Sequence, residues 1–103
     1  MFVVIFTHVR PVEEVDRHRE AHFAYIDRRY AEGVYLLSGR REPRNGAVIL
    51  AAGDDPAAME EIVRADPFIR AGVARYEIVP FLPGRAAPSL AALLPPSAGA
   101  GQA

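Results

Sequence analysis

The chain has 103 residues, half of them apolar, which predicts one globular domain and excludes wholesale disorder. Its 12 basic and 13 acidic side chains nearly cancel, and this disfavours a nucleic-acid partner because phosphate-binding domains are normally basic. The absence of cysteine excludes disulfides, thiolate zinc sites and cysteine nucleophiles. Neither a signal peptide nor an apolar run of about 18 residues is visible, so we expect a cytoplasmic protein with no membrane partner.

Apolar patterning predicts four strands and two helices. The strands are short runs rich in β-branched and aromatic residues, and the first is apolar at odd and even positions alike, as if buried on both faces. The helices carry apolar residues at spacings of three, four and seven. In chain order, the predictions are a strand over 2–7, a helix over 12–32, strands over 34–37 and 47–51, a helix from 56 to 65, a short extra turn over 68–71, and a strand over 73–81.

Punctuating residues mark the ends of these elements. Gly33 stands where a helix is followed by a left-handed residue, and Asn45-Gly46 is a strong hairpin signal. Asp55 is a good N-cap with Pro56 at the first helical position. Pro80 in the last strand predicts an edge position, since proline cannot donate to a neighbouring strand.

The predicted order is β-α-β-β-α-β, an α+β fold of the ferredoxin-like kind over residues 1–82. Residues 83–103 are rich in alanine and proline, with Arg85 as their only charged side chain. We expect this tail to lie outside the fold and to be dispensable for folding. Its leucines, Leu90, Leu93 and Leu94, could dock as one helical turn.

The strands also predict a partner. Two helices cover only one face of a four-stranded sheet, so the apolar residues of the other face would stay exposed in a monomer. We therefore expect a homodimer in which sheet packs against sheet. Either Val4 or Ile49 is expected to face the partner, so that aspartate at that position would give a monomer or an aggregate.

Histidine and aspartate residues form the first candidate for chemistry. His22 shares the inward face of the first helix with Val15 and Ile26, and a histidine in an apolar layer needs a hydrogen-bond partner. Asp66 ends the second helix on the same side of the sheet. A carboxylate that fixes the tautomer and an imidazole that moves the proton are the minimum for general acid/base catalysis.

Structural interpretations of the same residues stay open. Asp66 before Pro67 also reads as an N-cap, and a lone His22 also reads as a satisfied core histidine. His18, four residues earlier, is expected near solvent. The His18/His22 pair has the spacing of metal ligands but no evident third ligand, so we expect no metal.

Polar residues around the second strand are candidates for substrate binding. Ser38 could donate a hydrogen bond to a ligand, whereas a nucleophilic role would need its own base. Gly39 is interpreted as permitting an unusual backbone angle. Arg40 and Arg41 could attract a substrate carboxylate, and His8 ends the first strand as a polar residue at its rim.

Three stretches together resemble the YciI-like, or YCII-related, family of dimeric α/β-barrel proteins: EAHFAYI over 20–26, LLSG over 36–39 and RADPFIRAGVARYEIVPF over 64–81. The resemblance covers about residues 1–82. It implies a ferredoxin-like fold, a dimer, and an active-site pair formed by the helix histidine and the aspartate of the Asp-Pro-aromatic motif. By motif these are His22 and Asp66, with Ser38 at the family's strand-end serine.

Two positions depart from the family pattern. Glu20 replaces a proline that often precedes the histidine by two residues, which is harmless at a helix start. Arg40 replaces the proline that usually follows the strand-end glycine, which could reshape the cleft rim. A relative that resembles this family eliminates chloride from a chlorinated hydroxyhydroquinone, and the wider dimeric α/β-barrel group includes muconolactone isomerase-like and monooxygenase-like enzymes.

The sequence thus predicts a cofactor-independent enzyme of the lyase or isomerase kind, acting by proton transfer on a small aromatic or carbonyl compound. His22 would be the acid or base, Asp66 would orient it, and Ser38, Gly39, His18 and Arg40 would contact substrate. The alternative is a dimeric module that binds a metabolite or supports a partner without turnover. We expect a purely structural His22–Asp66 pair to stabilise the fold more than a catalytic one does.

Overall fold

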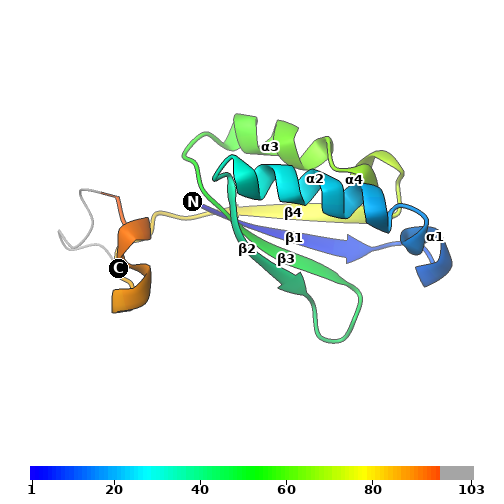
Figure 1. Ribbon diagram of the computed structural model, residues 1–103, viewed down its shortest axis with the longest axis horizontal. Helices are drawn as coiled ribbons and strands as arrows, with labels where there is room; N and C mark the ends of the chain where they lie inside the picture. Colours follow the sequence, from blue (N-terminus) through cyan, green and yellow to red (C-terminus); the bar gives the residue numbers. More distant parts are fainter. Residues whose placement is uncertain (96–103) are drawn as a thin grey trace.

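The computed structural model describes residues 1–95 and consists of one four-stranded antiparallel sheet with its helices on one face (Figure 1). The strand order is β2-β3-β1-β4, so the chain follows the predicted β-α-β-β-α-β path. The elements are β1 (Phe2–His8), α1 (Val12–Asp16), α2 (Arg19–Ala31), β2 (Tyr35–Arg40), β3 (Gly46–Ala51), α3 (Pro56–Arg64), α4 (Pro67–Arg70), β4 (Ala74–Pro80) and the 3₁₀ helix η1 (Pro88–Leu93).

The predicted helix over 12–32 is wrong in one respect: it is two helices, α1 and α2, separated by Arg17 and His18. His18 leaves the helical conformation, with φ −110° and ψ 4°, and its N–H closes α1 on the carbonyl of Val15. Val15 and His22 are both buried on either side of the break. The apolar spacing therefore continues through the interruption, and periodicity alone could not reveal it.

Strand β1 alternates between the two faces of the sheet. Phe2, Val4 and Phe6 are at most 1% exposed beneath the helices, while Val3 and Ile5 are half-buried on the opposite face. The expectation that this strand is buried on both faces is therefore wrong for the single chain. Only the helix-covered face carries the core.

The open face of the sheet is lined by residues other than those expected. Val4 and Ile49 both point to the helices and are 0% and 1% exposed, so neither faces a partner. The apolar side chains of the open face belong to β1, β2, β3 and β4. They are Val3, Ile5, Leu37, Val48, Leu50 and Val79.

The predicted boundary residues behave largely as expected. Asp55 accepts a hydrogen bond from the Ala57 N–H at 3.0 Å and begins α3. Gly33 has φ 74° directly after the α2 cap, and Pro80 lies on the edge strand β4. Gly39 is a correction, because its φ is not positive and its backbone is that of an ordinary strand residue.

The tail turns away from the sheet at Pro83, and Figure 1 shows η1 beyond the end of the sheet, away from α2 and α3. No residue of η1 is buried in the single chain, and Leu90 is 52% exposed. The expectation that the tail is dispensable for folding stays a prediction, and part of the tail lies outside the described residues. Over residues 1–95 the helices include none long and apolar enough to cross a membrane.

Gly46 and Gly39 provide a matched pair of substitutions that tests the β1–β3 register. A Cβ at Gly46 would lie 1.9 Å from the carbonyl oxygen of Phe6, which is backbone and cannot turn away. We expect Gly46→Ala to lower the free energy of unfolding by about 2 kcal/mol or more. A Cβ at Gly39 meets nothing within 4 Å, so Gly39→Ala should stay within about 0.5 kcal/mol of wild type. Urea unfolding measures both, and equal effects would contradict the register described here.

Candidate active site

A buried histidine–aspartate pair joins two helices on the covered face of the sheet. His22 comes from the first turn of α2, and Asp66 immediately precedes α4. The imidazole Nδ1 lies 2.9 Å from each carboxylate oxygen. The side chains are 4% and 0% exposed, respectively. The contact that helix phase and topology predicted is therefore present.

The backbone before Pro67 fixes the position of the carboxylate. A residue that precedes proline is held out of the α region, and Asp66 accordingly has φ −63° and ψ 134°. Its Oδ1 also accepts the Phe68 N–H at 2.8 Å, which caps α4. The two interpretations of Asp66, helix cap and histidine partner, are both correct, since one carboxylate has acceptor sites for both donors.

Aromatic rings hold the imidazole of His22 in one orientation. The ring of Phe68 stacks on it with centroids 4.0 Å apart and planes 6° from parallel. Phe23 and Phe6 flank it at 5.6 and 6.0 Å. Because packing and the Asp66 contact restrain the same ring, it loses little further freedom when it meets a ligand.

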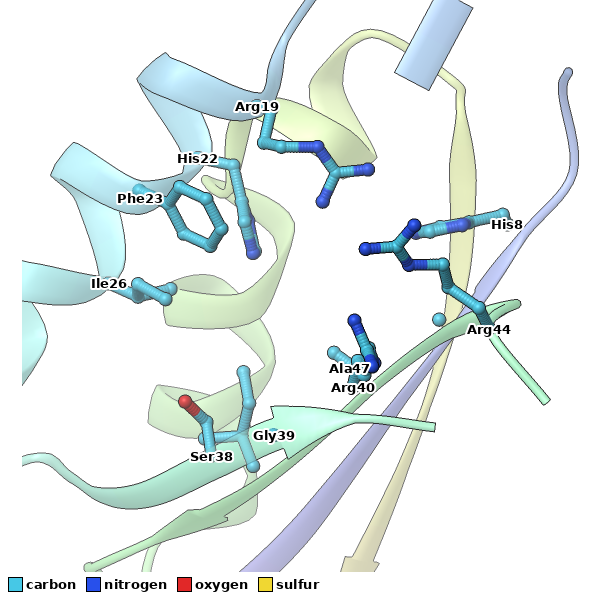
Figure 2. Close-up of a pocket in the computed structure, with 12 residues that line it drawn as sticks. His8, Arg19, His22, Phe23, Ile26, Ser38, Gly39, Arg40, Arg44 and Ala47 are labelled. Atoms are coloured by element: carbon cyan, nitrogen blue, oxygen red, sulfur yellow. The ribbon is translucent and has the colours of Figure 1, made fainter. Parts of the chain in front are cut away.

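The aspartate also selects the tautomer of His22. A carboxylate can only accept, so Nδ1 carries the proton and donates it to Asp66. Nε2 then keeps its lone pair. Figure 2 shows the imidazole of His22 directed into a cavity, where Nε2 is the ring nitrogen left to meet a bound molecule.

The cavity in front of His22 has a volume of about 340 Å³, which lies at the small end of ligand pockets and suits a single-ring compound. Its apolar lining consists mainly of Phe23 and Ile26 from α2 and Ile49 from β3. In the described part of the chain, no three His, Cys, Asp or Glu side chains lie close enough to hold a metal ion.

The predicted substrate-binding residues divide between this cavity and other surfaces. Ser38, Gly39 and Arg40 line it beside His22. His18 does not: it lies in a second, shallower hollow between α2 and α4. Arg41 points to the open face of the sheet, where its guanidinium donates to Thr7 Oγ1 at 2.7 Å, so it cannot serve this cavity.

Sequence reasoning missed several lining residues. Arg19 stands three residues before His22, on the same helix face, and that spacing could have revealed it. Arg44 comes from the β2–β3 loop and carries no such signal. His8 lines the cavity too, whereas the sequence favoured its interpretation as a polar strand-end residue over a place at the cleft rim. The hydroxyl of Tyr30 shares a hydrogen bond with Oγ of Ser38.

The groups around His8 shift the pKa of its imidazole. Burial, followed by the guanidinium of Arg19 and the neighbouring imidazole of His22, lowers the pKa of the His8 imidazole below its ordinary value of 6.5. Asp16 opposes this with a smaller effect. Burial and the guanidinium of Arg19 thus both disfavour the protonated form of His8.

The fold and the motifs of this site place the protein in a known class. Residues 1–82 match the YCII-related domain family, and the chain belongs to that family. The structure is similar to that of 5-chloro-2-hydroxyhydroquinone dehydrochlorinase (TftG) from Burkholderia phenoliruptrix AC1100 in complex with 2,5-dihydroxybenzoquinone. The match has a TM-score of 0.66 at 18% sequence identity and covers 79% of this chain and 93% of that chain, so it establishes a shared fold. No curated protein matches the sequence significantly.

Proposed function

We propose that the protein is a cofactor-independent enzyme that moves a proton on a small, single-ring or carbonyl-containing substrate, as a lyase or isomerase does. The observation that carries this proposal is the His22–Asp66 pair, whose free nitrogen faces a cavity of about 340 Å³. A merely structural pair would not need an open cavity at Nε2.

The proposed reaction follows from the tautomer. Nε2 of His22 accepts a proton from an acidic C–H or O–H of the substrate, and the Asp66 carboxylate stabilises the resulting imidazolium. Ser38, whose Oγ can accept from the Tyr30 hydroxyl, donates a hydrogen bond to the substrate oxygen that gains charge. In an isomerisation the imidazolium then returns its proton to another substrate atom. In an elimination the electron pair expels a leaving group, and the imidazolium releases its proton to solvent.

The size of the substrate is argued from the cavity and from the comparison. The dehydrochlorinase of the same fold is described with 2,5-dihydroxybenzoquinone, which is a single six-membered ring. A ring of that size fits the volume here and would lie against Phe23 and Ile26.

We also propose that the working unit is a homodimer formed through the open face of the sheet. Leu37 of β2 is 67% exposed there, Val48 of β3 is 40% exposed, and Leu50 of β3 lies opposite Leu37. A contiguous apolar surface of this kind is unusual on a monomer, and a second copy of the same face would cover it.

Hydrogen exchange into bound compounds tests the enzymatic proposal. Single-ring hydroxyquinones, 2-oxo acids and lactones are first screened for compounds that raise the melting temperature and move the NMR signals of His22. Each compound is then incubated with the protein in D₂O, and deuterium uptake is followed. We expect wild type to accelerate exchange and His22→Gln to lower that rate by about 10²- to 10⁴-fold.

The alternative, a metabolite-binding module, predicts a different outcome. Compounds would still move the signals of His22, but wild type and His22→Gln would leave their exchange and their composition unchanged. That result would replace the enzymatic proposal with the binding one.

A further inference from the structure

The cavity that contains His22 is strongly cationic at one end. Its lining includes three arginines and two histidines and no carboxylate, in a protein whose overall charge is −1. In Figure 2 the guanidinium groups of Arg19, Arg40 and Arg44 and the imidazole of His8 extend toward the same space that His22 faces. These groups come from α2, β2, the β2–β3 loop and β1, so the tertiary fold alone brings them together.

Nearby carboxylates neutralise little of this charge. Asp16 accepts from Arg19 Nε at 2.8 Å, which leaves the two terminal nitrogens of that guanidinium available. Glu42 approaches Arg40 at 3.7 Å, but both side chains are largely exposed, and such a pair is weak. Among residues 1–95, Arg44 makes no ion pair.

An adjoining hollow continues the same surface outward. It shares His8, Arg19 and Arg44 with the cavity and adds Arg10, with Asp16 as its only acidic residue. Converging guanidinium groups repel one another. Without an anion they raise the free energy of the empty site, and an anionic oxygen between them removes that cost through charge-assisted hydrogen bonds.

We propose that the substrate is an anion whose charged oxygen is held by Arg44 and Arg19, with Arg40 beside them, while its apolar body lies against Phe23 and Ile26. The negative group is a carboxylate or an ionised enol of a ring compound. This inference deepens the proposed function and rests on it for the reaction, but its test measures binding alone. The cationic end also gives charge that develops on the substrate a place to be stabilised when His22 removes the proton.

Three single-ring probes separate charge from shape: 2,5-dihydroxybenzoate carries a carboxylate, 2,5-dihydroxybenzoquinone an ionised enol, and hydroquinone no charge. Calorimetric titration is carried out on wild type, Arg44→Gln, Arg19→Gln and Arg64→Gln. Arg64 ends α3 and lines neither of the two cationic hollows, so its variant makes the same change in net charge elsewhere.

We expect at least one anionic probe to bind about tenfold or more tightly than hydroquinone. Arg44→Gln and Arg19→Gln should each weaken that probe by about tenfold and leave hydroquinone unchanged, whereas Arg64→Gln should alter neither. Which anionic probe binds identifies the carboxylate or the enol as the recognised group.

Titration of His8 by NMR supplies a second measurement. The groups that act on His8 are Arg19, His22 and Asp16, and the free protein should show its pKa below 6.5. A bound anion adds negative charge beside the imidazole and must raise that pKa. A neutral probe should leave it unchanged.

Three results would overturn the proposal: hydroquinone binding as tightly as the anionic probes, Arg64→Gln weakening binding as much as Arg44→Gln does, or no anionic probe moving the His8 and His22 signals. Repeating the titrations on His22→Gln keeps this test independent of the reaction. If anions bind there but no proton exchange occurs in wild type, the site inference holds and the enzymatic proposal fails.

Discussion

Asp66→Asn is expected to leave the protein folded and to lower the rate of proton transfer by about 10²- to 10⁴-fold. The amide oxygen can keep the bond from the Phe68 N–H, so the cap of α4 survives. The amide nitrogen then takes the place of Oδ2, 2.9 Å from Nδ1 of His22, and it can only donate. Nδ1 lies 2.9 Å from both positions, so it now meets an amide donor beside the amide oxygen. That donor favours the tautomer in which Nδ1 accepts and the proton lies on Nε2. In this tautomer the nitrogen that faces the cavity cannot act as a base.

Two measurements check this expectation. The rate of exchange or turnover reports the loss of the base, and ¹⁵N chemical shifts of the imidazole report the change of tautomer. Asp66→Ala is the contrasting variant: it removes the cap and leaves His22 without a partner in a site where neither residue is exposed. We expect it to cost about 2–4 kcal/mol of stability. An Asp66→Asn protein with unchanged rate and unchanged tautomer would show that the pair has only a structural role.

The loss of stability on mutation cannot by itself separate a catalytic His22–Asp66 pair from a structural one. Asp66 is 0% exposed and serves both α4 and His22, so removing it must destabilise the protein whether or not the pair is catalytic. The sequence suggested that a catalytic pair costs little stability when removed. That reasoning does not apply to a pair as deeply buried as this one.

Leu50→Asp is expected to convert the proposed homodimer to a folded monomer. Leu50 lies on the open face of β3, opposite Val3 of β1 and Leu37 of β2, near the middle of the apolar surface. In a sheet-to-sheet dimer each copy would bury an unpaired carboxylate there, at a cost of several kcal/mol. In the monomer the same carboxylate would remain in water, so folding should be preserved.

Light scattering coupled to size-exclusion chromatography, together with circular dichroism, tests this prediction. Val12→Asp is the matched control, since Val12 is 53% exposed on α1 and is not part of the sheet. It should leave the mass of the complex unchanged. Wild type that runs as a monomer at micromolar concentration, or Leu50→Asp that remains a dimer, would refute the proposed interface.

The sequence alone determined the order and type of the elements, because those depend on local chemistry. Asp55-Pro56 and Asp66-Pro67 begin helices for reasons contained in two or three residues, and Gly33 ends one. Helical phase also placed His22 on the inward face, and the fold topology supplied Asp66 as its partner, as the family motif also implied. The distance between them was predictable because both helices lie on one face of the sheet.

The tertiary structure decided which residues from distant segments of the chain line the same cavity. The cationic end of the cavity joins Arg19, Arg44 and His8 from three separate elements, and no local pattern links them. Strand register decided which alternate residues face the helices. Val4 therefore lies on the helix-covered face and Val3 on the open face. The same alternation sent Arg40 to the cavity and its neighbour Arg41 to the opposite face. A one-residue step reverses the face of a strand side chain, and an apolar run gives no sign of which face the helices will cover.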